Sequence, residues 1–128
     1  MAVVEYSRFV AKKAQSVTGS GFNPLFMPST AFDFQQSLID WSVKMGRAAI
    51  FADCGLGKTL MQLAWAQNVF QHTNKPVLIC TPLAVASQTC DEAEKFGIEA
   101  TQSKDGKHRG GIVVTNYERL QHFDETQF

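Results

Sequence analysis

The chain has 128 residues, of which 45% are hydrophobic, 11% aromatic and 19% charged, a composition typical of one globular domain that buries roughly two-thirds of its unfolded surface. Twelve basic and twelve acidic residues give a net charge of zero, which excludes a strongly basic nucleic-acid-binding protein but not a local basic patch. The cysteines Cys54, Cys80 and Cys90 are an odd number without close spacing, and we see neither a secretory signal nor an apolar run of about 18 residues, so we expect reduced thiols in a cytoplasmic protein without a membrane segment.

The first predicted element is a helix over residues 3–15. Its apolar side chains fall near one face: Val3, Tyr6, Phe9, Val10 and Ala14. Residues 16–30 are rich in Gly, Ser and Pro, which predicts a loop. A second helix is predicted to begin at Asp33 as its cap and to end at Gly46. We expect this helix to bury an apolar stripe made of Phe34, Leu38, Trp41 and Met45.

Residues 48–54, AAIFADC, form a short apolar run that ends at glycines. This pattern is typical of a buried strand. A helix is predicted to follow from Lys58 to about His72. Its inward face is expected to consist of Leu60, Leu63, Ala64 and Trp65.

The second half of the chain continues the alternation of strands and helices. The predicted elements are a strand over 76–82, a helix over 84–96 that stops at Gly97, a short strand within 97–103, a basic loop over 104–111, a strand over 111–117 and a polar tail. Alternation in this order predicts an α/β fold, a parallel sheet with flanking helices.

Residues 52–59, Ala-Asp-Cys-Gly-Leu-Gly-Lys-Thr, match the phosphate-loop pattern G-x-x-x-x-G-K-[ST] except that Ala52 replaces the first glycine. The backbone amides of Gly55, Leu56 and Gly57 are expected to point at phosphate oxygens. Lys58 and Thr59 are the candidate catalytic residues. Lys58 would meet the β- and γ-phosphates, and Thr59 would ligate Mg²⁺. The structural alternative is a glycine-rich turn that binds nothing. We interpret Asp53 and Cys54 as positions that point away from the phosphates rather than as a catalytic thiol.

Gln35, on the helix before this loop, resembles together with Phe34 the adenine-reading Q motif of superfamily 2 helicases and Swi/Snf-type translocases. A carboxamide suits adenine because it can donate a hydrogen bond to N7 and accept one from N6 at the same time. The alternative is a solvated helix glutamine, our interpretation of Gln36.

Two later segments resemble helicase motifs of the nucleic-acid side. Residues 76–88, PVLICTPLAVASQ, resemble motif Ia, and residues 111–120, GIVVTNYERL, resemble the later strand and turn of the same lobe. The resemblance implies contacts with nucleic-acid phosphates from Thr81, Pro82, Gln88, Thr115, Asn116 and Tyr117. The structural alternatives are that Thr81-Pro82 only ends a strand and that Tyr117 is a packed edge aromatic.

Taken together, the sequence resembles the first half of the N-terminal RecA-like lobe of a superfamily 2 helicase, and is most similar to the Swi/Snf-related helicases of bacteriophages and prophages. The resemblance implies an incomplete RecA-like P-loop lobe over 23–128, preceded by an N-terminal helix and linker over 1–22. It also implies ATP and Mg²⁺ as cofactors and nucleic acid as partner. DNA is the favoured partner, and RNA stays open as the alternative.

The family's second acidic motif, Asp-Glu, must follow a buried strand. Asp124-Glu125 does not, so we expect that motif and the second lobe beyond Phe128, and expect this chain alone to bind ATP without hydrolysing it efficiently. Without the strands that bear the later motifs, residues 48–54 and 76–82 are expected to pair directly or to cause self-association. Two other functions stay open, a small-molecule kinase and a non-catalytic interaction protein with a helicase-derived fold.

Overall fold

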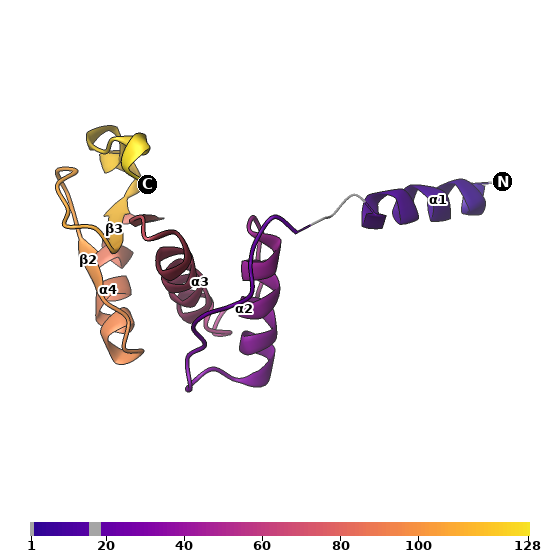
Figure 1. Cartoon of the computed structure of the whole chain (residues 1–128), viewed down its shortest axis with the longest axis horizontal. Coiled ribbons are helices and arrows are strands. Elements are labelled where there is room, and N and C mark those ends of the chain that lie inside the picture. Colours follow the sequence, from indigo (N-terminus) through magenta and orange to yellow (C-terminus); the bar gives the residue numbers. More distant parts are fainter. Residues whose placement is uncertain (1, 16–18) are drawn as a thin grey trace.

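The computed structural model describes residues 2–15 and 19–128, and three helices precede its first strand (Figure 1). The helices are α1 (Ala2–Gln15), α2 (Asp33–Met45), α3 (Lys58–Thr73) and α4 (Ala86–Lys95), and the strands are β1 (Val77–Thr81), β2 (Ala100–Gln102) and β3 (Ile112–Asn116). Three short 3-10 helices complete the chain: η1 (Leu83–Val85), η2 (Tyr117–His122) and η3 (Glu125–Gln127). The strands form one parallel sheet in the order β1-β3-β2, which confirms the predicted fold class.

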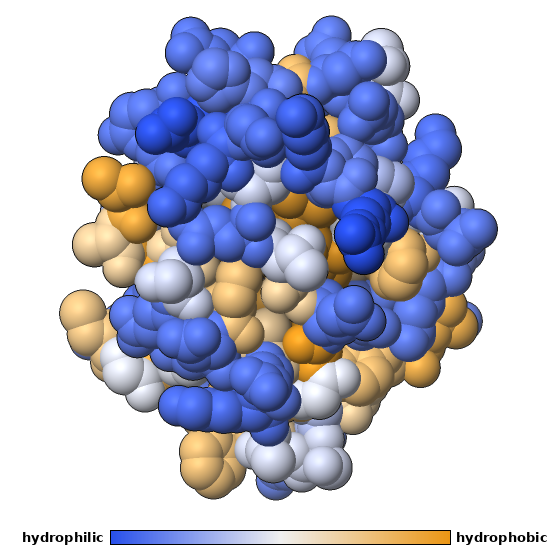
Figure 2. All heavy atoms as spheres, turned by 90° about the vertical axis from the view of Figure 1, so that its left-hand side faces the viewer, coloured by the Kyte–Doolittle hydropathy of each residue, from blue (hydrophilic) through white to orange (hydrophobic). Residues whose placement is uncertain are grey.

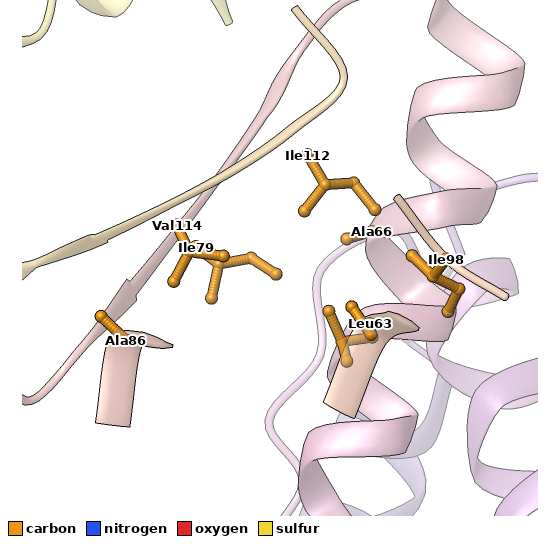
Figure 3. Packing of buried hydrophobic residues seen from close by; sticks show 8 residues of the cluster. Leu63, Ala66, Ile79, Ala86, Ile98, Ile112 and Val114 are labelled. Carbon is orange, nitrogen blue, oxygen red and sulfur yellow. The ribbon is translucent and has the colours of Figure 1, made fainter. Parts of the chain in front are cut away.

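The main core lies where α3 and α4 pack on one face of this sheet. Ile79 of β1 pairs in register with Val114 of β3, their side chains lie side by side (Figure 3), and both belong to the buried cluster that includes Leu63 of α3. Burying a side chain of this size stabilises the fold by about 1.5–3 kcal/mol. The other fully or nearly fully buried members of the cluster are Ala66, Ala86, Ala93, Ile98 and Ile112. Leu63 therefore faces inward as predicted, and the sheet positions the start of α3.

A second, smaller core joins α2 to α3 through Ile39 and Val43, which contact Met61 and Ala64. The buried face of α2 consists of Gln35, Ile39, Ser42 and Val43. The predicted stripe was therefore wrong. Phe34 and Trp41 are 44% and 43% exposed, and Leu38 and Met45 are only half-buried. The pattern misled because the true face contains two polar residues whose side chains bond to backbone carbonyls.

The start and end of α2 differ in how well they were predicted. Phe32 is the N-cap and Asp33 is the first helical residue, so the cap prediction is off by one position. Gly46 ends the helix with φ of 78°, a left-handed conformation that suits glycine, as predicted.

A buried asparagine, Asn68 of α3, fixes the irregular segment that leads to α2. Its Oδ1 accepts hydrogen bonds from the backbone amides of Leu25 at 2.6 Å and Phe26 at 2.8 Å. Its Nδ2 donates to the carbonyl of Phe26 at 2.8 Å. The Asn68 side chain thus forms the hydrogen bonds with this backbone that a neighbouring strand would form.

The strand predicted over residues 48–54 does not form, and this prediction was wrong. These residues have no regular secondary structure and are largely exposed, with Phe51 98% exposed. A strand needs a hydrogen-bonding partner, and residues 48–54 pair with none of the three strands, although β1 lies at an edge of the sheet. Direct pairing of residues 48–54 with the strand over 76–82 was therefore also wrong.

α1 forms as predicted, and its apolar side chains are largely exposed. Val3, Tyr6, Phe9 and Val10 are between 46% and 77% exposed, and Figure 1 shows the helix projecting away from the other elements. The side chain of Ala14 lies outside the described residues. None of the described helices combines the length and the apolar character that a membrane span requires.

Candidate functional site

The loop at residues 52–59 leads into α3 through two left-handed glycines. Gly55 has φ of 78° and Gly57 has φ of 77°, a region that side chains with a Cβ rarely adopt. Gly57 is also the N-cap of α3, so the first amides of the helix face the loop and are free to bind an anion. The backbone therefore has the curl that a phosphate cradle needs.

Lys58 bends back over this loop. Its Nζ donates to the carbonyl of Ala52 at 2.8 Å and to that of Asp53 at 3.0 Å. An ammonium group has three N–H donors, so one donor is still available to an oxygen of a ligand. The next residue, Thr59, lies half-buried in the first turn of α3.

One backbone amide of the loop forms a hydrogen bond within the loop. The Asp53 carboxylate accepts a hydrogen bond from the Cys54 amide at 2.9 Å. Cys54 is an exposed, free thiol. Asp53 therefore has a local role in the shape of the loop, which the sequence did not indicate.

Gln35 braces the loop from α2. Its Oε1 accepts from the Phe32 amide at 2.9 Å, and its Nε2 donates to the Leu56 carbonyl at 3.0 Å. The side chain is only 5% exposed. A Cβ added to Gly57 would overlap the Nε2 of Gln35, so the carboxamide packs directly against the loop. Each end keeps one unused hydrogen-bonding position.

The carboxyl ends of β1 and β3 bring together residues predicted for nucleic acid. Thr81 and Asn116 are register partners at these ends, Pro82 follows β1, and Tyr117 follows β3. Tyr117 is 56% exposed, so it is not the packed edge aromatic of the alternative interpretation. Gln88 lies apart, on the exposed side of α4, where its Nε2 donates to Glu92 at 3.1 Å.

Three polar side chains at this edge are buried: Thr81, Thr115 and Asn116. Thr115 is 0% exposed and Asn116 is 3% exposed, and neither Thr115 Oγ1 nor Asn116 Oδ1 has a hydrogen-bond partner among the described residues. Thr115 was predicted to contact nucleic acid, but its side chain lies beneath the surface. The Asn116 Nδ2 donates to Glu118, and this hydrogen bond lowers the pKa of the Glu118 carboxyl. Buried acceptors without partners cost about 1–3 kcal/mol each.

Asp124-Glu125 follows the 3-10 helix η2 rather than a strand, as expected. Asp124 Oδ1 accepts from the Thr126 hydroxyl at 2.7 Å and from its amide at 3.0 Å, and these bonds lower the pKa of the Asp124 carboxyl. The described part of the chain has no group of three or more His, Cys, Asp or Glu side chains that would hold a metal. Thr59 at the loop therefore remains the candidate for Mg²⁺.

A cavity of about 590 Å³ lies between α2, α3 and residues 48–50. Its apolar lining comes from Ile50, Met61 and Trp65, and its cationic lining from Arg47 and Lys58. The sequence did not indicate this cavity, because it exists where residues 48–50 have no neighbouring strand.

Comparison with known proteins adds one match. Residues 29–127 match the sequence model of the family described as type III restriction enzyme, res subunit. No curated protein matches the chain. The matched range begins before α2 and includes Gln35, the loop at 52–59 and all three strands.

Proposed function

Because this chain belongs to the family of the type III restriction enzyme res subunit, a superfamily 2 helicase-like family with a RecA-like domain, we propose that it is the ATP-binding part of an ATP-dependent nucleic-acid motor. The observation that carries the proposal is the loop geometry. Two left-handed glycines precede α3, and the Lys58 ammonium lies across the loop. Such a loop binds phosphate oxygens through backbone amides, helix dipole and charge together.

Within this proposal each loop residue has one role. The amides of Gly55, Leu56 and Gly57 bind phosphate oxygens, Lys58 neutralises the β- and γ-phosphates, and Thr59 ligates Mg²⁺. Mg²⁺ would supply positive charge that offsets the negative charge of the phosphates. The hydroxyl of Thr59 fits this ion because Mg²⁺ takes oxygen ligands.

We further propose that the lobe spans 23–128 and follows an N-terminal helix and linker over 1–22, and that the chain belongs to the Swi/Snf-related phage and prophage group. The projection of α1 away from the other elements supports the division (Figure 1). Four runs of the sequence resemble that group and support the subgroup: YSRFVAKK, GFNPL, FDFQ and GRAAIFADCGLGKTLMQLAWA. DNA is the proposed partner. Its proposed contacts at the carboxyl edge of the sheet are the exposed Pro82 and Tyr117, with the buried Thr81 and Asn116 beside them. Gln88 is proposed to add a contact from α4.

Gln35→Ala is expected to weaken binding of ATP more than that of GTP. The free N–H and lone pair of the carboxamide can pair with N7 and N6 of adenine, whereas guanine presents O6 at that edge. Calorimetric titration with both nucleotides measures the effect, and Gln36→Ala, on the neighbouring position of α2, is the control. Equal changes for ATP and GTP would show that Gln35 only braces the loop.

Self-association is proposed through residues 48–54 and the cavity beside them. The exposed Phe51 and the backbone of this segment, which pairs with none of the strands, provide an edge for a second chain. Burial of a phenylalanine stabilises by about 1.5–3 kcal/mol, so Phe51→Asp is expected to raise the dimer dissociation constant at least tenfold.

Light scattering over a concentration series measures this constant. Leu83→Asp, at an equally apolar and 64% exposed position on η1, is the matched control. A wild-type chain that stays monomeric at all concentrations would refute the proposal.

A further inference from the structure

The loop between β2 and β3 concentrates positive charge in a chain whose net charge is zero. Residues 104–109 contain Lys104, Lys107 and Arg109 against a single carboxylate, Asp105. That carboxylate has an internal role. Its Oδ1 accepts from the Lys107 amide at 3.1 Å, and this bond lowers the pKa of the Asp105 carboxyl. The sequence alone indicated a basic loop but gave it no task.

The structure holds this loop against the segment that follows β3. Gly106 lies so close to the carbonyl of His122 that a Cβ would overlap it. The His108 Nε2 donates to Gln127 Oε1 at 2.7 Å, because its Nδ1 accepts from the Gly110 amide. The His108 ring also packs on Phe128, with ring centroids 5.1 Å apart. The loop is thereby fastened beside η2, at the carboxyl end of β3 (Figure 1).

The cations of the loop face solvent. Lys104 and Arg109 are exposed, and neither forms an ion pair with any residue that the structure describes. The Lys107 side chain is 91% exposed, and its nearest carboxylate oxygen is 4.0 Å away. Hydrophilic side chains cover the upper part of the face seen in Figure 2, the end at which Figure 1 places this loop. These charges are available to a polyanion.

An exposed aromatic side chain, Tyr117, begins the 3-10 helix that this loop contacts at its last residue. η2 runs from Tyr117 to His122, the residue that Gly106 contacts, and six residues of a 3-10 helix span about 12 Å. Successive phosphates of one strand are about 3.4 Å apart along a duplex axis. A strand stacked on Tyr117 would therefore reach the loop within about four nucleotides. Cations beside an aromatic platform are typical of single-strand binding.

We propose that Lys104, Lys107 and Arg109 bind the phosphate backbone of a single nucleic-acid strand and extend the edge formed by Asn116 and Tyr117. This inference rests on the proposed function, because it assumes that nucleic acid passes the carboxyl edge of the sheet. It adds a binding element that lies in none of the segments resembling helicase motifs. Phosphate contacts carry no base preference, so the loop contributes affinity and salt dependence and not sequence specificity.

The test compares Lys107→Ala/Arg109→Ala with Lys75→Ala/Lys95→Ala, which removes two cations that precede β1 and β2 at the amino edge of the sheet. Fluorescence anisotropy of a labelled oligothymidylate of about 20 nucleotides is measured over a range of salt concentrations. Each lost phosphate contact reduces the slope of log K against log salt by about 0.7 for single strands. For the loop variant, the slope of log K against log salt is expected to be smaller in magnitude by about 1.4. Its affinity for the oligonucleotide near 0.1 M salt is expected to be roughly 20-fold lower.

Three results would overturn the inference. These are an unchanged slope in the loop variant, an equal loss in the amino-edge control, and failure of Lys107→Arg/Arg109→Lys to restore binding. Calorimetric titration with ATP, run on the same proteins, separates this inference from the proposed function. ATP binding that persists while the loop variant binds DNA normally would refute only the loop's role, whereas a wild-type chain that binds neither ligand would refute both.

Discussion

Lys58→Ala is expected to lower the affinity for ATP about 10- to 100-fold. The side chain is the cation nearest the loop, and a charge-assisted hydrogen bond contributes about 1.5–3 kcal/mol, which corresponds to that range of dissociation constants. Calorimetric titration of wild type and variant with Mg²⁺-ATP measures the change. Equal affinities for the two proteins would refute the assignment of the phosphate site.

The control for this experiment is Lys44→Ala. Lys44 is exposed and pairs with Asp40 of α2 at 2.8 Å, so the variant removes the same charge from a position outside the loop. Exposed pairs of this kind contribute little to stability. We expect Lys44→Ala to bind ATP as wild type does. A shared loss in both variants would point to general electrostatics rather than to Lys58.

Gly57→Ala is expected to destabilise the fold by roughly 2–4 kcal/mol and to abolish nucleotide binding. Alanine in a left-handed conformation costs about 1–2 kcal/mol. In addition, the new Cβ would overlap Gln35 Nε2, and moving that side chain breaks bonds worth about 0.5–1.5 kcal/mol each. Thermal and denaturant unfolding measure the loss of stability.

Gly55→Ala separates the two causes. Gly55 has nearly the same φ, but a Cβ there meets nothing within 4 Å, so only the backbone strain remains. We expect about 1–2 kcal/mol of destabilisation in this control. Equal losses at both glycines would mean that Gln35 moves aside freely and does not brace the loop.

The sequence predicted those elements whose structure depends on neighbours along the chain. The glycine-rich loop, α3 and the apolar strands β1 and β3 were found because periodicity and punctuating glycines determine them. The inward face of α3, with Leu60, Leu63 and Ala64 buried, follows from the same pattern. These features need no knowledge of distant residues.

The errors arose where structure depends on a partner. Residues 48–54 have the composition of a buried strand, but strand formation requires hydrogen bonds to another segment. The buried face of α2 was misjudged because Gln35 and Ser42 are polar yet satisfied by backbone carbonyls. The hydrogen bond that holds the basic loop joins His108 to Gln127, which lies 19 positions away. No local sequence pattern predicts such a bond.

The bonds within the phosphate loop make ATP binding an exchange reaction. Before a ligand arrives, Lys58 already has the Ala52 and Asp53 carbonyls as acceptors, and the Cys54 amide already has the Asp53 carboxylate. A phosphate therefore competes with oxygens that the chain itself supplies. The observed affinity is the difference between two sets of hydrogen bonds, so a change at Asp53 that weakens the internal set would tighten nucleotide binding without any new contact to the ligand.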